Sequence, residues 1–360
     1  MKRFAIVLLA SVLLAGISLP LAAVTSLSSP SVSAHHAALY EPVTDTFLYE
    51  KNGDERAPMA STTKIMTALV ALERGDLETV VTIPDEACHI EGSSIYMTPG
   101  EHLTLRELLY ALLLQSANDA ATAIAISVGG SVPEFARMMN ERAQEMGLQN
   151  THFVNPHGLD DPEHYTTAHD LARITACAME IPVFRDIVGT VKYRIPQGDG
   201  GDMRVLFNHN KLLRLYRDSV GVKTGFTKKS GRCLVGAACR DGVTLISVTL
   251  DAPNDWNDHI TLFEYGFSRM ENRLLAEKGS FLYSLPVIGK EGGTVLCTNS
   301  EDATAILGRD EEAPEVKLDL PHYLTSRGRV GAVVGHLQFY RGDRLVCEVP
   351  LVITDESPTM

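Results

Sequence analysis

Apolar residues recur at helical spacing in several segments of the first 270 positions. A wide apolar stripe and a following Gly75 predict a helix over residues 61–74; the stripe comprises Ile65, Met66, Leu69, Val70 and Leu72. Thr104 and Glu107 form a capping box ahead of the apolar run 108–114, which we expect to be a buried central helix. Further helices are predicted over residues 119–128, 133–146, 167–179 and 257–270.

Alternating or continuous apolar segments predict strands between these helices. Residues 38–40 and 47–49 flank a polar turn and favour a hairpin, and residues 80–83 favour a short strand. Segments 186–196 and 202–207 are strand-like, and residues 220–227, 233–240 and 243–250 indicate three consecutive antiparallel strands. The combination predicts an α+β fold in which helices flank an antiparallel sheet.

The pattern changes at about residue 271, where helical periodicity ends. Short segments separated by Gly, Asp and Pro predict strands over 293–298, 303–307, 316–320, 333–340 and 345–353. The turn Arg341-Gly342-Asp343 joins the last two as a hairpin. We therefore expect a catalytic domain over residues 35–271 and a small all-β domain with an acidic tail over residues 272–360, the latter without a catalytic group.

The N-terminus has the composition of a secretory signal. Met1-Lys2-Arg3 precedes an apolar run over residues 4–21, and the small residues Val32-Ser33-Ala34 offer a cleavage site that gives a signal peptide over residues 1–34. Leu21-Ala22-Ala23 is a second candidate site. A retained membrane anchor is the alternative, although the Ser/Pro-rich residues 26–33 favour cleavage. No other segment is long enough to predict a transmembrane helix.

Composition excludes some classes of protein. A hydrophobic content of 45% is ordinary for a globular chain, and a net charge of −13 argues against nucleic acid and against a polybasic membrane surface. The six cysteines lack C-x-x-C spacing, which argues against zinc and redox sites. Export would permit disulfides, and the one pairing to consider is Cys297 with Cys347, because both lie in the C-terminal region; buried free thiols are favoured over this pairing. Cys233 and Cys239 share one face of a strand, which suits core packing.

Ser61 and Lys64 are the first candidates for chemistry. They are separated by one helical turn and share a face of the predicted helix. A serine hydroxyl needs a neighbouring base to act as a nucleophile, and a buried lysine that is partly neutral can serve. Taken alone, the pair is better explained by Ser61 as a helix cap and Lys64 as a solvated side chain.

Two later motifs change that interpretation. Ser116-Ala117-Asn118 lies between two buried helices, a rigid place to present a hydroxyl and an amide. Lys223-Thr224-Gly225 lies in a predicted strand. The order S-x-x-K, S-x-N, K-T-G is the signature of penicillin-binding proteins and class A β-lactamases.

The likeness extends over roughly residues 37 to 350. Residues 60–67, 115–121 and 221–235, with the run Asn155-Pro156-His157-Gly158-Leu159 and its continuation to residue 168, resemble the D-alanyl-D-alanine carboxypeptidases, the low-molecular-weight penicillin-binding proteins of serine peptidase family S11. The resemblance implies a β-lactamase/D,D-peptidase-like fold that needs no cofactor and no metal. It also implies peptidoglycan stem peptides ending in D-Ala-D-Ala as substrates and β-lactam antibiotics as inhibitors.

The resemblance also implies four catalytic residues. Ser61 would attack the penultimate D-alanine carbonyl, and Lys64 would accept its proton. Ser116 would relay a proton to the leaving amine, and Asn118 would hold Lys64 and the substrate backbone. Water would then release the acyl-enzyme.

Five further residues would bind substrate. Lys223 and Thr224 would recognise the terminal carboxylate, with help from His209. Gly225 would let the substrate backbone approach the strand. The backbone N–H groups of Phe226 and of Ser61 would form the oxyanion hole.

Other functions are weighed beside this one. Four histidines, His152, His157, His164 and His169, could suggest a metal, but their spacing matches no standard zinc pattern. A class A β-lactamase needs a deacylating glutamate, for which residues 119–222 offer no convincing loop. A D,D-endopeptidase would use the same residues, and a penicillin-binding sensor would acylate without turnover.

The C-terminus departs from the family pattern. Many members end in an amphipathic helix or hydrophobic tail that holds them on the membrane, whereas this sequence ends in Thr354-Asp355-Glu356-Ser357-Pro358-Thr359-Met360. An acidic tail cannot bind anionic lipid. We therefore expect an exported, extracytoplasmic protein that is secreted or peripherally membrane-associated, with membrane attachment left open.

Overall fold

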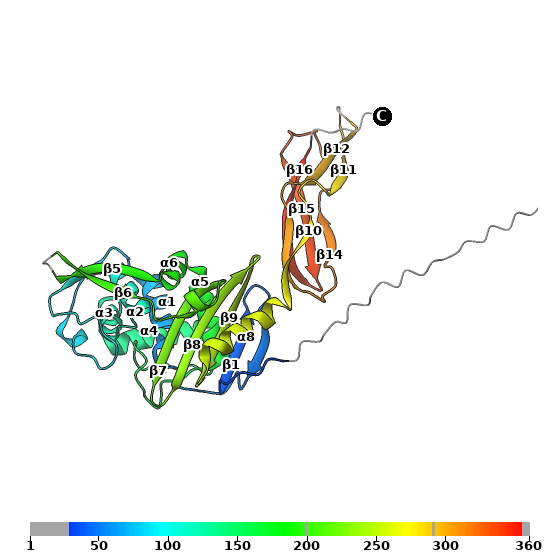
Figure 1. The fold of residues 1–360 in the computed structure, drawn as a ribbon. Helices are drawn as coiled ribbons and strands as arrows, with labels where there is room; N and C mark the ends of the chain where they lie inside the picture. The colour runs from blue at the N-terminus through cyan, green and yellow to red at the C-terminus, as the bar shows by residue number, and fades with distance from the viewer. Residues whose placement is uncertain (1–28, 199–200, 290–291, 355–360) are drawn as a thin grey trace, which may run out of the picture.

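A five-stranded antiparallel sheet organises the N-terminal two thirds of the computed structural model, which describes residues 29–198, 201–289 and 292–354 (Figure 1). The strand order is β2-β1-β9-β8-β7. These strands are β1 (His36–Glu41), β2 (Thr46–Lys51), β7 (Ser219–Thr227), β8 (Gly231–Arg240) and β9 (Val243–Leu250). Because β1 pairs with β9, the N-terminal hairpin completes a sheet made mostly from residues far along the chain.

Helices cover both faces of this sheet, as the predicted α+β fold requires. Side chains alternate between the faces, so Leu39 and Leu245 pack with α8 while Ala38 and Ile246 pack with the larger group of helices. The helices are α1 (Lys64–Arg74), α2 (Leu105–Leu114), α3 (Asn118–Gly129), α4 (Val132–Glu145), α5 (Ala168–Glu180), α6 (Pro182–Gly189), α7 (Leu212–Leu215) and α8 (Asp255–Phe267).

Capping side chains fix two of the helix starts that the sequence predicts. Thr104 Oγ1 accepts the backbone N–H of Glu107, whose carboxylate accepts the backbone N–H of Thr104 in return. Thr167 Oγ1 accepts the backbone N–H of Asp170 at the start of α5. The capping box and the second cap are therefore confirmed.

The predicted start of the helix at residue 61 is wrong by one turn. Residues Ala60–Thr63 form a short 3₁₀ turn, and α1 begins at Lys64. The hydroxyls of Thr62 and Thr63 donate to the carbonyls of Met59 and Ala60, which tightens the chain into this turn. Ser61 thus lies on a 3₁₀ turn immediately before the α-helix.

The strand expected over residues 186–196 is half helix. Its first residues belong to α6, and β5 (Lys192–Gln197) begins only after Thr190. Pro182 suits the first turn of a helix, and Phe184, Ile187 and Val188 recur at helical spacing and are buried. The predicted strand at 202–207 is present as β6 (Asp202–Phe207), which pairs with β5. A second short pair joins β3 (Val80–Thr82) to β4 (His102–Thr104), and a 3₁₀ turn covers Asp85–Ala87.

The C-terminal region is all-β, as predicted, and projects from the helical body (Figure 1). β10 (Met270–Ala276) pairs with β13 (Ala303–Gly308). A separate sheet has the order β11-β12-β16-β15-β14, formed by β11 (Leu282–Pro286), β12 (Thr294–Asn299), β14 (Glu315–Asp319), β15 (Val333–Arg341) and β16 (Arg344–Ile353). Arg344 donates to the carbonyl oxygens of Val43 and Thr44 in the β1–β2 turn, which ties the two regions together.

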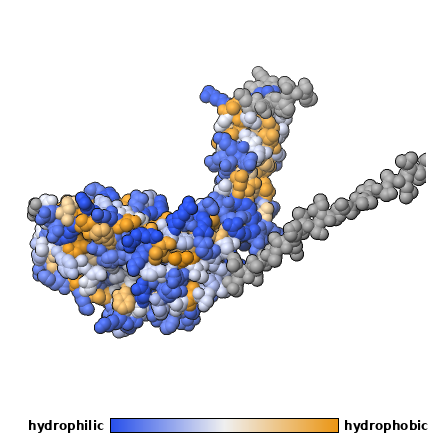
Figure 2. Space-filling model, viewed as in Figure 1, coloured by the Kyte–Doolittle hydropathy of each residue, from blue (hydrophilic) through white to orange (hydrophobic). Residues whose placement is uncertain are grey.

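Apolar side chains are also exposed on the C-terminal region, where Figure 2 shows several hydrophobic patches. They include Leu282, Tyr283, Ile288, Tyr323, Val330 and Val333. The described residues contain no helix with the length and apolar character needed to span a bilayer.

Most of the predicted signal peptide, residues 1–28, lies outside the described residues. Its last residues are part of the fold. The Asp258 carboxylate on α8 accepts the backbone N–H groups of Ser33 and Ala34, at 2.9 and 3.0 Å, and the Ser33 hydroxyl at 2.7 Å. Val32 and Ala34 are buried beside them.

All six cysteines are free thiols in the structure. Cys297 is buried and Cys347 half-buried, and the two are not bonded to each other. Cys233 is buried as expected, but the expectation that Cys239 packs in the core is wrong. Cys239 is the penultimate residue of β8, directly after the buried part of the strand ends.

Candidate active site

Two of the three sequence motifs meet at the ammonium group of Lys64. Its Nζ lies 3.0 Å from Ser61 Oγ, 2.7 Å from Asn118 Oδ1 and 2.6 Å from the carbonyl oxygen of His157. A lysine ammonium has three N–H donors, so these acceptors satisfy all of them. The side chain is thereby fixed with one donor aimed at the Ser61 hydroxyl.

Burial changes the acidity of Lys64. The residue is completely buried, and loss of solvation lowers the pKa of its ammonium well below the ordinary value for lysine. The charge of Lys223 lowers this pKa further, whereas the charge of Asp119 acts in the opposite direction. A lysine in such a place can lose its proton and accept one from Ser61.

Asp119 is a buried carboxylate that sequence reasoning did not single out. It accepts hydrogen bonds from Ser94 Oγ at 2.6 Å and from the backbone N–H groups of Ile95 and Met97 at 3.2 and 3.3 Å. The adjacent Asn118 donates its backbone N–H to Ser93 O at 2.7 Å. Asp119 therefore fixes the loop of residues 94–97 beside the site. The only sequence feature that could have drawn attention to Asp119 is its place as an acidic residue in the first turn of α3.

A hollow of about 350 Å³ opens beside Ser61. It brings together six residues that the sequence predicts for the site: Ser61, Ser116, His209, Thr224, Gly225 and Phe226. Burial and the charge of Lys223 lower the pKa of His209, which favours a neutral imidazole there. Its lining combines hydroxyl, imidazole and charged side chains with the aromatic rings of Phe226 and Trp256.

Lys223 lies in the predicted strand, but it is buried and is not among the residues that line the hollow. It is 1% exposed, its Nζ donates to Thr224 O at 2.8 Å, and burial lowers its pKa to about 7. Gly225 brings the strand against the Ser61 turn, since a Cβ on Gly225 would lie 3.0 Å from the Ser61 backbone nitrogen. Gly225 is expected to let the substrate backbone approach the strand, and in the structure its lack of a side chain lets the Ser61 turn approach.

The hollow also contains Arg232, Asp255 and Trp256, which no motif indicated. Arg232 lies opposite Phe226 in the β7–β8 register, which brings it to the site. One of its terminal nitrogens donates to both Asp255 oxygens, at 2.9 and 2.8 Å, and its guanidinium lies 5.7 Å from the Trp256 ring centre. The sequence feature that could have identified Arg232 is its position, because it is a cation on the strand next to Lys223-Thr224-Gly225.

The four histidines of the metal alternative bind separate partners. His152 contacts Glu163 O, His164 contacts Thr63 Oγ1, and His169 contacts Asp54. His157 contributes its backbone carbonyl to Lys64. The described residues contain no group of three or more His, Cys, Asp or Glu side chains arranged to hold a metal ion.

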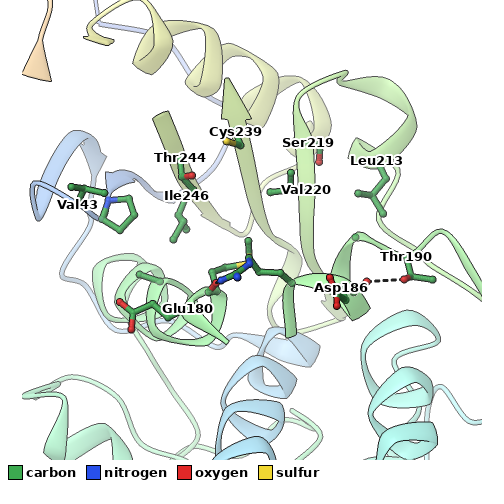
Figure 3. A pocket seen from close by; sticks show the side chains of 15 residues that line it. Val43, Glu180, Asp186, Thr190, Leu213, Ser219, Val220, Cys239, Thr244 and Ile246 are labelled. Carbon is green, nitrogen blue, oxygen red and sulfur yellow. Dashed lines mark hydrogen bonds between the residues drawn. The ribbon is translucent and has the colours of Figure 1, made fainter. Parts of the chain in front are cut away.

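A larger cavity, of about 840 Å³, lies between the sheet and helices α5 and α6 (Figure 3). Its walls include Glu180, Asp186, Ser219 and Thr244, and they share no residue with the hollow beside Ser61. Size alone would therefore not point to the motif residues. Ser61, whose hydroxyl contacts the buried Lys64, lines the smaller hollow.

Comparisons with known proteins agree on one family. Residues 23–254 match the family model described as D-alanyl-D-alanine carboxypeptidase. The chain is 30% identical over 334 residues to D-alanyl-D-alanine carboxypeptidase DacF of Bacillus subtilis, covering 90% of this chain and 85% of that protein. It is also 30% identical over 359 residues to DacA of Escherichia coli, covering 91% of this chain and 85% of the relative.

Solved structures give the same result for the fold. The crystal structure of the Streptomyces K15 DD-transpeptidase aligns with a TM-score of 0.64 and 34% sequence identity, covering 67% of this chain and 100% of that one. The predicted antiparallel sheet flanked by helices is therefore confirmed both by the structure and by its neighbours.

Proposed function

Because this chain belongs to the D-alanyl-D-alanine carboxypeptidase family of serine peptidases, we propose that it removes the terminal D-alanine from peptidoglycan stem peptides through an acyl-enzyme on Ser61. The single observation that carries the proposal is the 3.0 Å contact between a fully buried Lys64 ammonium and the Ser61 hydroxyl. This arrangement supplies a nucleophile and its base in one place.

Acylation begins with proton transfer from Ser61 Oγ to the neutral Lys64 amine. The oxygen then bonds to the carbonyl carbon of the penultimate D-alanine, and the negative charge on the carbonyl oxygen is met by the N–H groups of Ser61 and Phe226. Asn118 keeps Lys64 in line through its 2.7 Å contact. Ser116, on the wall of the same hollow, relays the proton to the departing amine, and water later hydrolyses the ester.

Recognition of the terminal carboxylate falls to Thr224, with charge from Lys223 below it and from Arg232 beside it. Lys223 has a pKa of about 7, so it is only partly charged at neutral pH in the empty site. Arg232 is charged at all physiological pH values and lines the hollow. We assign Arg232 to this subsite as a second cation, and His209 to its rim.

The direct test is release of free D-alanine from a synthetic peptide ending in Lys-D-Ala-D-Ala, with Ser61→Ala as the matched control. Release by the unaltered protein alone would support the carboxypeptidase. A cross-linked peptide dimer run in parallel detects the endopeptidase alternative. Cleavage of the dimer without release from the linear peptide would overturn the proposed substrate while keeping Ser61 as nucleophile.

The substrate requires an extracytoplasmic location, and we propose export by the N-terminal signal. Of its two candidate cleavage sites, the contacts of Ser33 and Ala34 with Asp258 favour Leu21-Ala22-Ala23. Cutting after Ala34 would remove three residues that are built into the fold, two of them buried. On the same grounds the catalytic domain would include Val32–Ala34 and extend to about residue 271.

A further inference from the structure

The turn that carries Ser61 is held by a chain of buried hydrogen bonds that starts at His164. The His164 Nδ1 accepts the backbone N–H of Val154 at 3.0 Å, so in the neutral imidazole the proton is on Nε2. Nε2 then donates to Thr63 Oγ1 at 2.8 Å. The Thr63 hydroxyl in turn donates to the carbonyl oxygen of Ala60 at 2.7 Å.

Ala60 needs such support because its backbone has a φ of +47°, in the left-handed region that side chains with a Cβ avoid. Gly158 also packs against the Ala60 carbonyl, next to the Thr63 hydroxyl. A Cβ on Gly158 would lie 2.0 Å from Ala60 O, so that only glycine lets the two backbones meet. Thr63 and Gly158 together leave the Ala60 carbonyl one direction in which to point.

The direction of that carbonyl determines the direction of the Ser61 N–H. The peptide unit between Ala60 and Ser61 is planar and trans, so its C=O and N–H point in opposite directions. Fixing the oxygen therefore aims the N–H, whose nitrogen lies beside the β7 strand at Gly225. That N–H is one of the two oxyanion donors in the proposed mechanism.

We propose that Thr63 and His164 are positioning residues for the oxyanion hole, acting through Ala60 and without touching the substrate. The inference rests on the proposed function, since it concerns the acyl-enzyme on Ser61. Both side chains are nearly inaccessible, Thr63 at 0% and His164 at 4% exposure. Burial lowers the pKa of His164 to about 4, which keeps the neutral tautomer that the chain of hydrogen bonds requires.

The test compares Thr63→Val, which has the same shape but no hydroxyl, with Thr63→Ser, which keeps it. Removing an oxyanion donor costs roughly 10²–10³ in rate, so a donor that is merely misaimed should cost about tenfold in the first-order acylation constant with benzylpenicillin. We expect Thr63→Val to lose this much with unchanged initial binding, and Thr63→Ser to stay within about threefold of the unaltered protein.

The spectroscopic readout is the ester carbonyl stretch of the acyl-enzyme, measured by isotope-edited infrared difference. Hydrogen bonds from the oxyanion hole polarise this carbonyl, so the band should move to higher wavenumber in Thr63→Val. Thr175→Val is the matched control, because Thr175 is equally buried and its hydroxyl donates at 2.7 Å to the carbonyl oxygen of Leu171 in α5, outside the Ser61 turn. It should leave the band unmoved.

Two further variants extend the test to the histidine. His164→Gln keeps an N–H donor and should be closer to the unaltered protein than His164→Leu. The double variant Thr63→Val with His164→Leu should lose no more acylation rate than Thr63→Val alone, because both break the same chain.

Two negative outcomes are distinct. An unmoved carbonyl band and a normal acylation constant in Thr63→Val would overturn the positioning role alone. Failure of penicillin to acylate the unaltered protein would overturn the proposed function, and the positioning role with it.

Discussion

Lys64 Nζ and Ser61 Oγ lie 3.0 Å apart, with the lysine fully buried and the serine on the 3₁₀ turn just before it. In the proposed mechanism, this contact places the base beside the hydroxyl that it deprotonates. Asn118 and the His157 carbonyl hold the remaining donors of Lys64. The site is therefore assembled before substrate arrives, as preorganised catalysis requires.

The pH dependence of kcat/KM should be bell-shaped. Activity rises with pH as Lys64 loses its proton, and it falls above pH about 7 as Lys223 becomes neutral and no longer attracts the substrate carboxylate. Lys223→Arg keeps its charge at all these pH values. We expect it to lose the alkaline limb and keep the acid limb, measured with the D-Ala-D-Ala peptide. If the alkaline limb were unchanged in Lys223→Arg, the charge of Lys223 would not be what binds the substrate carboxylate.

Asp119→Asn should affect both the loop and the base. Replacing a carboxylate that accepts hydrogen bonds from Ser94 and from the backbone N–H groups of Ile95, Met97 and Ala120 should lower the free energy of unfolding by about 1–3 kcal/mol, measured by urea denaturation. The charge of Asp119 raises the pKa of Lys64, so its loss should move the acid limb to lower pH. Ser94→Ala, which removes one contact and no charge, should leave the acid limb in place. An acid limb that shifts equally in both variants would argue against the electrostatic role.

Arg232→Gln should weaken recognition of the terminal carboxylate. We expect kcat/KM for the free-acid peptide to fall at least tenfold, the cost of about one charged hydrogen bond. The same peptide with an amidated C-terminus should be cleaved equally by both proteins. Lys211→Gln removes the other cation that lines the hollow and serves as the control. An equal loss on acid and amide peptides would mean that Arg232 supports the wall of the site and does not bind the carboxylate.

The exported protein should begin upstream of Val32. Intact mass and N-terminal sequencing should give a chain that starts at Val24, after Leu21-Ala22-Ala23. A chain starting at His35 lacks the contacts with Asp258 and should be less stable by about 2–3 kcal/mol, through lost hydrogen bonds and burial. A natural N-terminus at His35 would contradict this account.

The motifs predicted the centre of the site well because they are local and their elements are strongly patterned. Ser61, Lys64 and Asn118 converge as expected, and the apolar run of α2 that leads to Ser116 is buried. What periodicity could not give was the turn type at Ser61. That turn depends on the hydroxyls of Thr62 and Thr63 bonding back to the chain, which competes locally with an α-helical start.

The residues that the sequence did not reveal depend on contacts between distant segments. Arg232 reaches the site through its register with Phe226, and its partner Asp255 comes from the start of α8. A strand pattern also does not say that one of its lysines will be only 1% exposed, as Lys223 is. The helix α6 was mistaken for a strand because a short apolar run fits both periods.

The central claim, that Lys64 activates Ser61, is tested most directly by intact-mass kinetics of benzylpenicillin acylation in the unaltered protein, Ser61→Ala and Lys64→Ala. We predict a long-lived adduct that peptide mapping locates on Ser61, none in Ser61→Ala, and an acylation rate in Lys64→Ala that is lower by at least about 10², the lower range for a lost general base. An adduct in Ser61→Ala, a near-normal rate in Lys64→Ala, or rapid hydrolysis of the antibiotic would contradict it.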